Sequence, residues 1–343
     1  MIKQAAKQIG IGIVGAGLIG GKRAQAILAV RGGGKLAAVA DINRARADAL
    51  GAKYGCAVYY DWKKLVALRD IDVEIVATTN NMTARVAVAA LRAGKHVLCE
   101  KPFGRNVKES RMILRAARQS GRLVKVGFSN RFHPGILMAK KFLDRGVIGK
   151  VLFIRARHGH GGRTGMEKEW RLNKHIAGGG ELLDQGVHII DLCRWFGGDF
   201  TEADGVTDTK YWKTNVDDNA FAILRSNDVT ASMHVSTTNW GNIFSFEVFG
   251  KDGYIIVDGL GKRYGVETLR VGKRTPPFND VKVKEYTFPR DVDDSWEKEW
   301  ENLLCAVRGK GKLIGDGEDG LRANQIVEAI YRSSESGRVV KLP

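Results

Sequence analysis

The sequence predicts an α/β protein of two domains, the first built on a doubly wound parallel sheet. Apolar runs of strand length alternate with helix-length stretches through the first third of the chain, which is the pattern of βαβ units. The first run leads directly into a glycine-rich turn, GIVGAGLIG at residues 12–20. Beyond about residue 130 strand-like runs dominate, several joined by short turns, which indicates an antiparallel second sheet.

The first domain is expected at residues 1–129, with five strands and four helices between them. Its predicted strands are residues 9–14, 36–40, 73–77, 96–99 and 124–128. Its predicted helices are residues 20–30, 45–54, 83–93 and 110–120. Since βαβ crossovers are almost always right-handed, these units build one twisted sheet with helices on both faces.

The second domain is expected at residues 130–343. Its predicted strands are residues 151–158, 220–224, 230–237, 244–249, 254–258 and 267–271. Its predicted helices are residues 135–144, 180–196 and 318–334, and the last of these could pack back on the first domain. Asp217 and Asp218 precede a strand, and we interpret them as turn acids.

Charge and composition exclude several classes of protein. The net charge of +17 is dispersed, with no run of five basic residues and no nucleic-acid motif, so we expect no nucleic-acid partner. A solvated basic surface explains this charge, and an anionic substrate is the alternative. No stretch approaches the roughly 20 apolar residues of a membrane helix, and the first strand follows the N-terminus too closely for a signal peptide. We therefore expect a cytoplasmic protein.

The cysteines give no sign of a metal site or a disulfide framework. The four residues are far apart and form no C-x-x-C pair, and no histidine lies at ligand spacing from them: Cys56, Cys99, Cys193 and Cys305. We interpret them as reduced thiols and expect no bound metal.

Gly15, Gly17 and Gly20 have the G-x-G-x-x-G spacing of a dinucleotide-binding turn. In such turns the first glycine permits a tight turn, the second lets the backbone approach the pyrophosphate, and the third allows close helix–strand packing. The phosphates lie at the helix N-terminus, where N–H groups and the helix dipole attract an anion. We therefore expect NAD here, also contacted by Leu18 and Ile19; an ordinary βα turn is the alternative.

Asp41 supplies the second half of this motif, because it ends the second strand 21 residues after Gly20 (41 − 20). A carboxylate there binds the ribose hydroxyls and repels a 2′-phosphate, which favours NAD over NADP. Arg44 follows it and could soften that preference, so NADP stays possible. The alternative for Asp41 is a loop acid that caps the next helix.

Polar residues follow the third and fourth strands, at the carboxyl edge where doubly wound sheets bind ligands. After the third strand come Thr78, Thr79 and Asn80, expected cofactor contacts with turn and cap roles as the alternative. After the fourth come Glu100 and Lys101, which are also expected cofactor contacts, and then Pro102. Proline holds Lys101 extended, and its ammonium would stabilise negative charge on a reacting hydroxyl oxygen. By residue type alone, Lys101 reads as a surface charge.

Residues 178–191, GGGELLDQGVHIID, place a histidine among acids on one predicted helix. Asp184 and His188 are i and i+4, and Asp191 is i+3 from His188, so they share a helix face. An imidazole beside a carboxylate is suited to act as a general base near neutral pH. The alternative is an ordinary helical histidine bridged by its neighbours.

Basic and aromatic residues near the start of the second domain are candidates for substrate binding: Asn130, Arg131, His160, Arg163, Trp170 and Arg171. The cations could bind a phosphate, a carboxylate or a nucleotide sugar, and Trp170 could stack on a sugar face. A solvated loop at an oligomer contact is the alternative for the residues from 160 to 171.

On these segments the chain resembles the Gfo/Idh/MocA family of NAD(P)-dependent oxidoreductases. The resemblance covers nearly the whole length, and E-K-P together with D-x-G-x-H-x-x-D is its most specific part. The segments that carry it are GIVGAGLIG (12–20), ADINRARADAL (40–50), AGKHVLCEKP (93–102), GFSNRFHPG (127–135), GGGELLDQGVHIIDLCRWFGG (178–198) and GEDGLRANQIVEAIYRSSESGRVVKLP (317–343).

The resemblance implies a Rossmann first domain and an α+β second domain with a large, open, mostly antiparallel sheet. It implies that this sheet forms the interface of a homodimer or homotetramer, and that the substrate is a sugar, polyol or related compound. It also implies that Lys101, Asp184 and His188 match the family's catalytic lysine, aspartate and histidine. Thr79 and Thr83 stand where many members carry a proline and a histidine, so the cofactor contact at this loop departs from the usual pattern of the family.

The resulting hypothesis is hydride transfer between NAD and a secondary hydroxyl of a pyranose, inositol or nucleotide sugar. His188 would accept the hydroxyl proton, Lys101 would stabilise charge on the same oxygen, and Asp184 would orient one of them. The alternatives are an NAD-dependent glycosidase of the same family, a non-catalytic NAD-binding sugar sensor, and a reductase of the imine, trans-dihydrodiol or biliverdin type. Because a sensor needs no proton-transfer residues, their presence counts against it.

Overall fold

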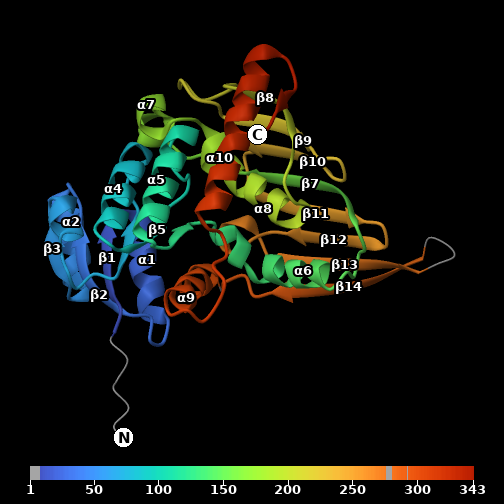
Figure 1. The fold of residues 1–343 in the computed structure, drawn as a ribbon. Helices are drawn as coiled ribbons and strands as arrows, with labels where there is room; N and C mark the ends of the chain where they lie inside the picture. The colour runs from blue at the N-terminus through green and yellow to red at the C-terminus, as the bar shows by residue number, and fades with distance from the viewer. Residues whose placement is uncertain (1–7, 276–279, 292) are drawn as a thin grey trace, which may run out of the picture. The chain divides into compact units, whose positions relative to one another are not determined.

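The computed structural model describes residues 8–275, 280–291 and 293–343 (Figure 1). Its described part divides into two compact units. Unit 1 takes the chain up to Gly104, Lys108–Gly127 and Trp296–Leu321. Unit 2 takes Arg105–Val107, Phe128–Ser295 and Arg322–Pro343. The long segment of unit 2 begins at Phe128, whereas the sequence placed the second domain from residue 130. The return of residues 296–321 to unit 1 was not predicted from the sequence.

Unit 1 contains a parallel six-stranded sheet in the order β3-β2-β1-β4-β5-β6, as a doubly wound fold requires. Its strands are β1 (Gly10–Val14), β2 (Lys35–Ala40), β3 (Ala57–Tyr59), β4 (Val73–Val76), β5 (His96–Cys99) and β6 (Val124–Val126). The sequence predicted all of these except β3, which is only three residues long. The strand order reverses between β1 and β4, and ligands bind at the carboxyl ends of strands beside such a reversal.

The helices of unit 1 are α1 (Leu18–Ala29), α2 (Arg44–Tyr54), α3 (Trp62–Val66), α4 (Asn80–Arg92), α5 (Val107–Ser120) and α9 (Ser295–Val307). Of these, α3 and α9 were not predicted. Trp300, Leu303 and Leu304 of α9 are buried in the same apolar core as Ile11 and Ile13 of β1. Burial of this apolar face explains why the late segment returns to the first unit.

Unit 2 contains an open nine-stranded sheet in the order β14-β13-β12-β11-β7-β10-β9-β8-β15. Its strands are β7 (Val151–Gly159), β8 (Glu202–Asp208), β9 (Asn219–Arg225), β10 (Thr230–Ser236), β11 (Ile243–Gly250), β12 (Gly253–Asp258), β13 (Glu267–Thr275), β14 (Asp280–Phe288) and β15 (Val340–Lys341). Only the β7–β10 pairing is parallel among them, which confirms the mostly antiparallel sheet. The sequence did not predict β8, β14 or β15; β8 reads EADGVTD and has few β-branched or aromatic residues.

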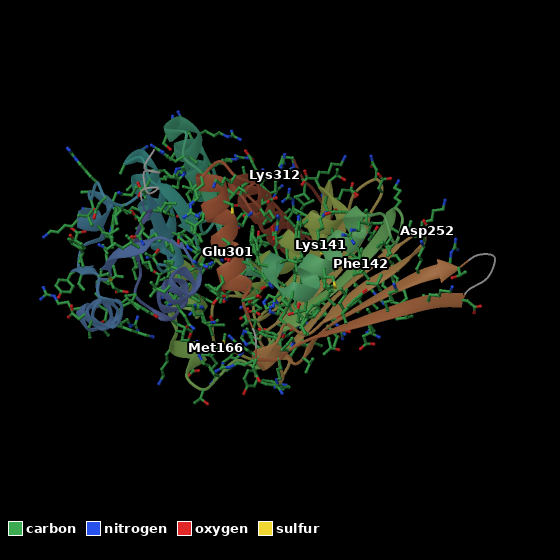
Figure 2. All side chains as sticks on the ribbon, turned by 90° about the horizontal axis from the view of Figure 1, so that it is seen from below. Lys141, Phe142, Met166, Asp252, Glu301 and Lys312 are labelled. Atoms are coloured by element: carbon green, nitrogen blue, oxygen red, sulfur yellow. The ribbon has the colours of Figure 1, made fainter. Side chains whose placement is uncertain are left out.

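Three long helices cover one face of this sheet: α6 (Pro134–Asp144), α8 (Val187–Gly197) and α10 (Gly317–Ser336) (Figure 1). Phe142 of α6, labelled in Figure 2, lies 5.8 Å from Tyr286 of β14 between ring centroids. The opposite face keeps large apolar side chains exposed, among them Phe153, Phe221 and Ile223. The strands therefore alternate between a helix-covered face and an uncovered one.

Candidate functional site

The glycine turn of unit 1 has the geometry that the dinucleotide motif requires. Gly15 has φ +103°, and a Cβ there would lie 2.3 Å from the carbonyl oxygen of Ala77, so only glycine fits. At Gly20 a Cβ would lie 1.9 Å from the carbonyl oxygen of Gly15, which shows how closely α1 packs on the turn. At Gly17 a Cβ would meet no atom within 4 Å. The backbone is thus open at the one glycine that would face a pyrophosphate.

The N-terminus of α1 is free to bind an anion. Gly17 is its N-cap, no side chain caps it, and its first turn holds no acidic residue. Leu18 is 77% exposed and Ile19 is half-buried, so this end of the helix faces solvent. Free N–H groups and a helix dipole with no competing carboxylate match a pyrophosphate. These residues therefore fit an NAD molecule.

Asp41 holds the glycine turn in place as well as lying at the predicted ribose position. Its carboxylate accepts the N–H of Ala16 at 2.7 Å and the N–H of Asn43 at 2.8 Å. The guanidinium of Arg44 lies 4.7 Å from the ring of Tyr60. The contacts of Asp41 and Arg44 with the cofactor stay predictions.

The polar residues after β4 line the same strand end. The Thr78 hydroxyl is buried and has no hydrogen-bond partner among the described residues. Thr79 is the N-cap of α4, and its hydroxyl donates to Asn81 at 2.7 Å. Asn80 is 7% exposed. A buried hydroxyl without a protein partner is a group that a bound cofactor would satisfy, and we regard Thr78 as the best supported of the three.

Glu100 lies in an ion cluster at the end of β5. Its carboxylate binds Arg23 of α1 at 2.6 Å, and Arg23 also binds Glu299 of α9 at 2.6 Å. Burial raises the pKa of Glu100, an effect that the nearby Arg23 opposes. The following residue, Lys101, is half-buried and precedes a cis peptide bond to Pro102. Arg23 thus fixes Glu100, the residue before Lys101. The contact of Glu100 with the cofactor stays a prediction.

The helix of unit 2 that carries His188, called the histidine helix below, consists of residues 182–197. It does not begin as the predicted α-helix. Residues Leu182–Gly186 form a π-helical turn that contains Asp184, and α8 begins after it at Val187. The predicted spacing of i and i+4 assumes an α-helix, whereas the hydrogen bonds of this turn join i and i+5. Single π turns of this kind occur frequently at functional sites. Asp184 is half-buried and His188 is 6% exposed.

Arg131 and Asp191 form a buried ion pair that anchors α8. The Arg131 guanidinium donates to both Asp191 oxygens at 2.7 and 2.6 Å, and it lies 5.1 Å from the Trp195 ring. Arg131 belongs to η1 (Ser129–Phe132) and is 3% exposed. This geometry argues against the predicted substrate contact of Arg131, since its donors bind the helix. Asp191 likewise serves Arg131, although the sequence suggested it as a neighbour of His188.

Asn130, the other predicted residue of η1, keeps a donor available. It is 7% exposed, and its side-chain nitrogen has no hydrogen-bond partner among the described residues. A buried amide without a protein partner is a group that a ligand would satisfy. The prediction that Asn130 binds substrate is therefore better supported than that for Arg131.

The loop of predicted substrate residues is held by its own ion pairs. Arg163 donates to both oxygens of Glu169 at 2.7 and 2.6 Å. Arg171 lies 3.7 Å from both Glu169 and Asp184, and it stacks on Trp170 with its guanidinium 4.6 Å from the ring. Arg171 thus links the loop to the predicted catalytic aspartate. The charge of Arg163 is already compensated, which weakens its case as an anion ligand.

His160 is the first residue of this loop and lies near Glu181, at the start of the helix that carries His188. Its Nδ1 accepts the N–H of Gly162 at 3.0 Å, which leaves the proton on Nε2. That Nε2 lies 3.8 Å from Glu181. The Met166 side chain, labelled in Figure 2, packs with Leu172 under the same loop. This loop therefore has a small core of its own.

A cavity of about 440 Å³ opens beside the loop. It is lined by Glu167, Lys168, Glu169, Trp170, Leu172, Asn173, Ile176, Lys213, Thr214 and Asn215. A volume of this size suits a small ligand, and the lining mixes an aromatic ring with many polar groups.

Asp217 and Asp218 do more than the turn role predicted from the sequence. Asp218 accepts the backbone N–H groups of Lys210, Tyr211 and Trp212 at 2.7–3.0 Å. Burial raises the pKa of Asp218, but these hydrogen bonds outweigh it and the pKa is lowered. Asp217 binds the start of the histidine helix instead, 35 residues earlier in the chain. No sequence spacing could have identified that contact, because it joins two segments that only the fold brings together.

Comparison with known proteins decides the family. A family model described as "Oxidoreductase family, NAD-binding Rossmann fold" matches residues 9–128, and a model described as "GFO/IDH/MocA C-terminal domain" matches residues 136–256. The chain belongs to the Gfo/Idh/MocA family. Its first domain is thus an NAD-binding Rossmann fold of an oxidoreductase family, which confirms the predicted resemblance, fold class and cofactor.

Several curated relatives of this chain are named sugar or polyol dehydrogenases. Levoglucosan dehydrogenase of Pseudarthrobacter phenanthrenivorans is 30% identical over 226 residues, 57% of each chain. Inositol 2-dehydrogenase of Salmonella typhimurium is 36% identical over 187 residues, 54% of this chain and 53% of the relative. These two alignments thus span little more than half of each relative. D-glucoside 3-dehydrogenase of Escherichia coli is 27% identical over 349 residues, 97% of each chain.

A solved structure has the same fold over nearly the whole of this chain. Levoglucosan dehydrogenase in complex with NADH and levoglucosan superposes with a TM-score of 0.89 over 98% of this chain and 100% of that one, at 24% identity. At this identity the likeness establishes the fold alone. Among the helices that the structure describes, none is both long and apolar enough to cross a bilayer.

Proposed function

We propose that the protein transfers a hydride between NAD(H) and a secondary hydroxyl of a carbohydrate, a pyranose, an inositol or a nucleotide sugar. The observation that carries the proposal is the helix of unit 2 that bears Asp184 and His188, in a chain whose unit 1 has an open dinucleotide-binding turn. The sugar and polyol dehydrogenases among its relatives support the substrate class.

The residues of this chain would handle the proton and the charge of the reaction. Bound NAD supplies the hydride acceptor, held by the turn at Gly17, by Asp41 and by Thr78. His188 accepts the hydroxyl proton as general base and returns it in the reverse direction. Lys101 hydrogen-bonds the same oxygen and stabilises its developing negative charge. Asp184 orients the proton-transfer group.

The loop of residues 160–171 is proposed to bind the rest of the sugar. Asn130 offers a buried amide donor, and Trp170 offers an aromatic face to the C–H face of a pyranose. Arg171 is held beside Asp184 at 3.7 Å and would bind a hydroxyl or an acidic group of the substrate. Because Arg163 is already paired with Glu169, the anionic substrate stays the lesser alternative.

We propose that the uncovered face of the nine-stranded sheet forms a homodimer or homotetramer interface. Phe153, Phe221 and Ile223 expose 39%, 51% and 38% of their surface on this face. These side chains come from β7 and β9, with β10 between the two strands. Several exposed apolar side chains on one face of a sheet are typical of a subunit contact. Light scattering on the purified protein tests this, and a monomer at micromolar concentration would contradict it.

The reaction is tested with a panel of inositols, hexoses, uronic acids, glycosides and UDP-sugars, read by the absorbance of reduced nicotinamide. Lys101→Ala and His188→Ala should keep NAD affinity and lose turnover by at least about 100-fold, the usual scale of a positioned acid–base group. The matched control is His175→Ala, an exposed histidine. Near-wild-type turnover in His188→Ala would remove that residue from the chemistry, and cleavage of a glycoside without net NAD reduction would favour the glycosidase.

A further inference from the structure

The start of the histidine helix is held by a single residue of another segment. Three consecutive N–H groups, those of Gly180, Glu181 and Leu182, all donate to Asp217. Gly180 and Leu182 reach the two carboxylate oxygens at 2.9 and 2.8 Å, and Glu181 reaches the main-chain oxygen at 2.9 Å. The first N–H groups of a helix have no partner within it. Asp217 therefore satisfies these donors at the start of the helix. Burial raises the pKa of Asp217, and the hydrogen bonds from Tyr331, Leu182 and Gly180 oppose this effect.

Asp217 is itself held by the C-terminal helix. The hydroxyl of Tyr331 on α10 donates to its Oδ1 at 2.6 Å and accepts the N–H of Gly180 at 3.1 Å. Burial and the neighbouring carboxylate raise the pKa of Tyr331 well above its ordinary value, so the phenol stays a donor. Tyr331 lies in the closing segment, residues 317–343, for which the proposed reaction gives no role.

The glycines before the helix pack closely against Asp217 and Tyr331. A Cβ at Gly180 would lie 2.0 Å from the carbonyl oxygen of Asp217, and a Cβ at Gly179 would lie 2.5 Å from the Tyr331 hydroxyl. These two positions therefore accept only glycine while the cap is intact. The cap immediately precedes the π turn Leu182–Gly186, which carries Asp184.

We propose that Asp217 and Tyr331 are positioning residues of the reaction centre: they fix the start of the π turn and thereby orient Asp184 and His188. The inference rests on the proposed function. A π turn holds one residue more than an α turn, and its helix can relax to the regular form if its start is released. Such a change would rotate Asp184 relative to His188, and reacting groups tolerate errors of only about 0.5 Å.

The test compares Tyr331→Phe with Ser333→Ala, a control on the same helix. Tyr331→Phe removes one hydroxyl and keeps the ring. Ser333 is buried, and its hydroxyl accepts the N–H of Gly205 at 3.0 Å, on strand β8 rather than on the histidine helix. For the best substrate of the panel, we expect Tyr331→Phe to lower kcat by at least 10-fold with unchanged NAD affinity. We expect Ser333→Ala to keep kcat within twofold.

A second readout needs no substrate. Ring ¹⁵N–¹H spectra of the histidines, with His188 assigned from its alanine variant, should show a shifted His188 signal in Tyr331→Phe and an unshifted one in Ser333→Ala. Asp217→Asn keeps one acceptor oxygen and should fall between wild type and Asp217→Ala in kcat. This order is not expected from a purely structural role, for which kcat would follow the melting temperature alone.

The proposal is overturned if Tyr331→Phe leaves the His188 ring signal unchanged. It is also overturned if Tyr331→Phe and Ser333→Ala lose kcat equally at an equal loss of melting temperature. Failure of the proposed function would look different. In that case His188→Ala would keep turnover, or no sugar would reduce NAD, while the spectra would still report whether Tyr331 controls the orientation of the helix.

Discussion

Arg23 and Glu299 bind each other at 2.6 Å although 276 residues separate them in the chain. Arg23 also binds Glu100 at 2.6 Å, and its guanidinium lies 4.2 Å from the ring of Trp296. Both Arg23 and Glu299 are almost completely buried. The cluster joins α1, the end of β5 and α9, so the residue before Lys101 is held by the late segment that returns to unit 1.

Removal of Arg23 should therefore destabilise the protein strongly. Arg23→Leu would leave two buried carboxylates without their cation, and breaking such a pair lowers the free energy of unfolding by about 3–5 kcal/mol. Urea denaturation measures this value. The control is Arg118→Leu, because Arg118 pairs with Glu318 on the surface and exposed pairs contribute at most about 1 kcal/mol. Similar midpoints for the two variants would contradict the role of the cluster.

Glu74 should make the free energy of unfolding fall as the pH rises. It is fully buried on β4, both its oxygens lack a hydrogen-bond partner among the described residues, and burial raises its pKa to about 8 against the nearby Lys95. The unfolded chain releases this proton near pH 4.5, whereas the folded chain keeps it to about pH 8. The stabilisation from the protonated form is complete below pH 4.5 and is lost as the pH rises through 8.

Glu74→Gln removes this titration, and urea midpoints at several pH values measure its effect. Relative to wild type, the variant should gain stability between pH 4.5 and 8, by up to roughly 3–5 kcal/mol at about 1.4 kcal/mol per unit. The control is Glu301→Gln, which changes an exposed acid of α9 that is labelled in Figure 2. Its gain in stability over wild type should not vary with pH in this range. Parallel pH profiles for wild type and Glu74→Gln would refute the assignment.

Alanine variants of Gly17 and Gly20 should affect different properties, the first NAD binding and the second stability. A methyl group at Gly17 meets no atom of the described residues within 4 Å, so Gly17→Ala should keep the melting temperature. The same methyl occupies the space through which the pyrophosphate approaches the backbone, so NAD affinity should fall at least 10-fold. Gly20→Ala places Cβ 1.9 Å from a carbonyl oxygen and should lower the melting temperature instead. Calorimetry and NAD titration check both; a Gly17→Ala protein with wild-type affinity would place the cofactor elsewhere.

Asp41 should set the preference for NAD over NADP. Its carboxylate is expected to repel a 2′-phosphate, so Asp41→Ser should narrow the ratio of kcat/KM for the two cofactors, with Arg44 then free to attract the phosphate. The ratio is measured with the best substrate of the panel. Asn43→Ser is the control, since it changes the cap of α2 without removing the carboxylate. An unchanged ratio in Asp41→Ser would mean that another group discriminates the two.

The glycine turn and the apolar strands could be predicted because their signals lie within a few consecutive residues. Gly15 requires a positive φ and Gly20 a close approach, so the turn was evident from spacing alone. Strands such as β4 and β7 are continuous or alternating apolar runs and were predicted nearly to the residue. Among the strands that were not predicted, β3 is short and β8 is poor in β-branched residues. Neighbouring strands stabilise these two more than their own composition does.

The sequence by itself determined the parallel fold of unit 1, the dinucleotide turn and the candidate chemistry of Lys101, Asp184 and His188. Only the tertiary structure decided that Arg131 anchors α8, that the histidine helix begins with a π turn, and that Asp217 caps it under the hydroxyl of Tyr331. The reason is the range of each interaction. Periodicity and turn chemistry act within a few residues, whereas a buried ion pair or a distant cap depends on which segments the packed core brings together.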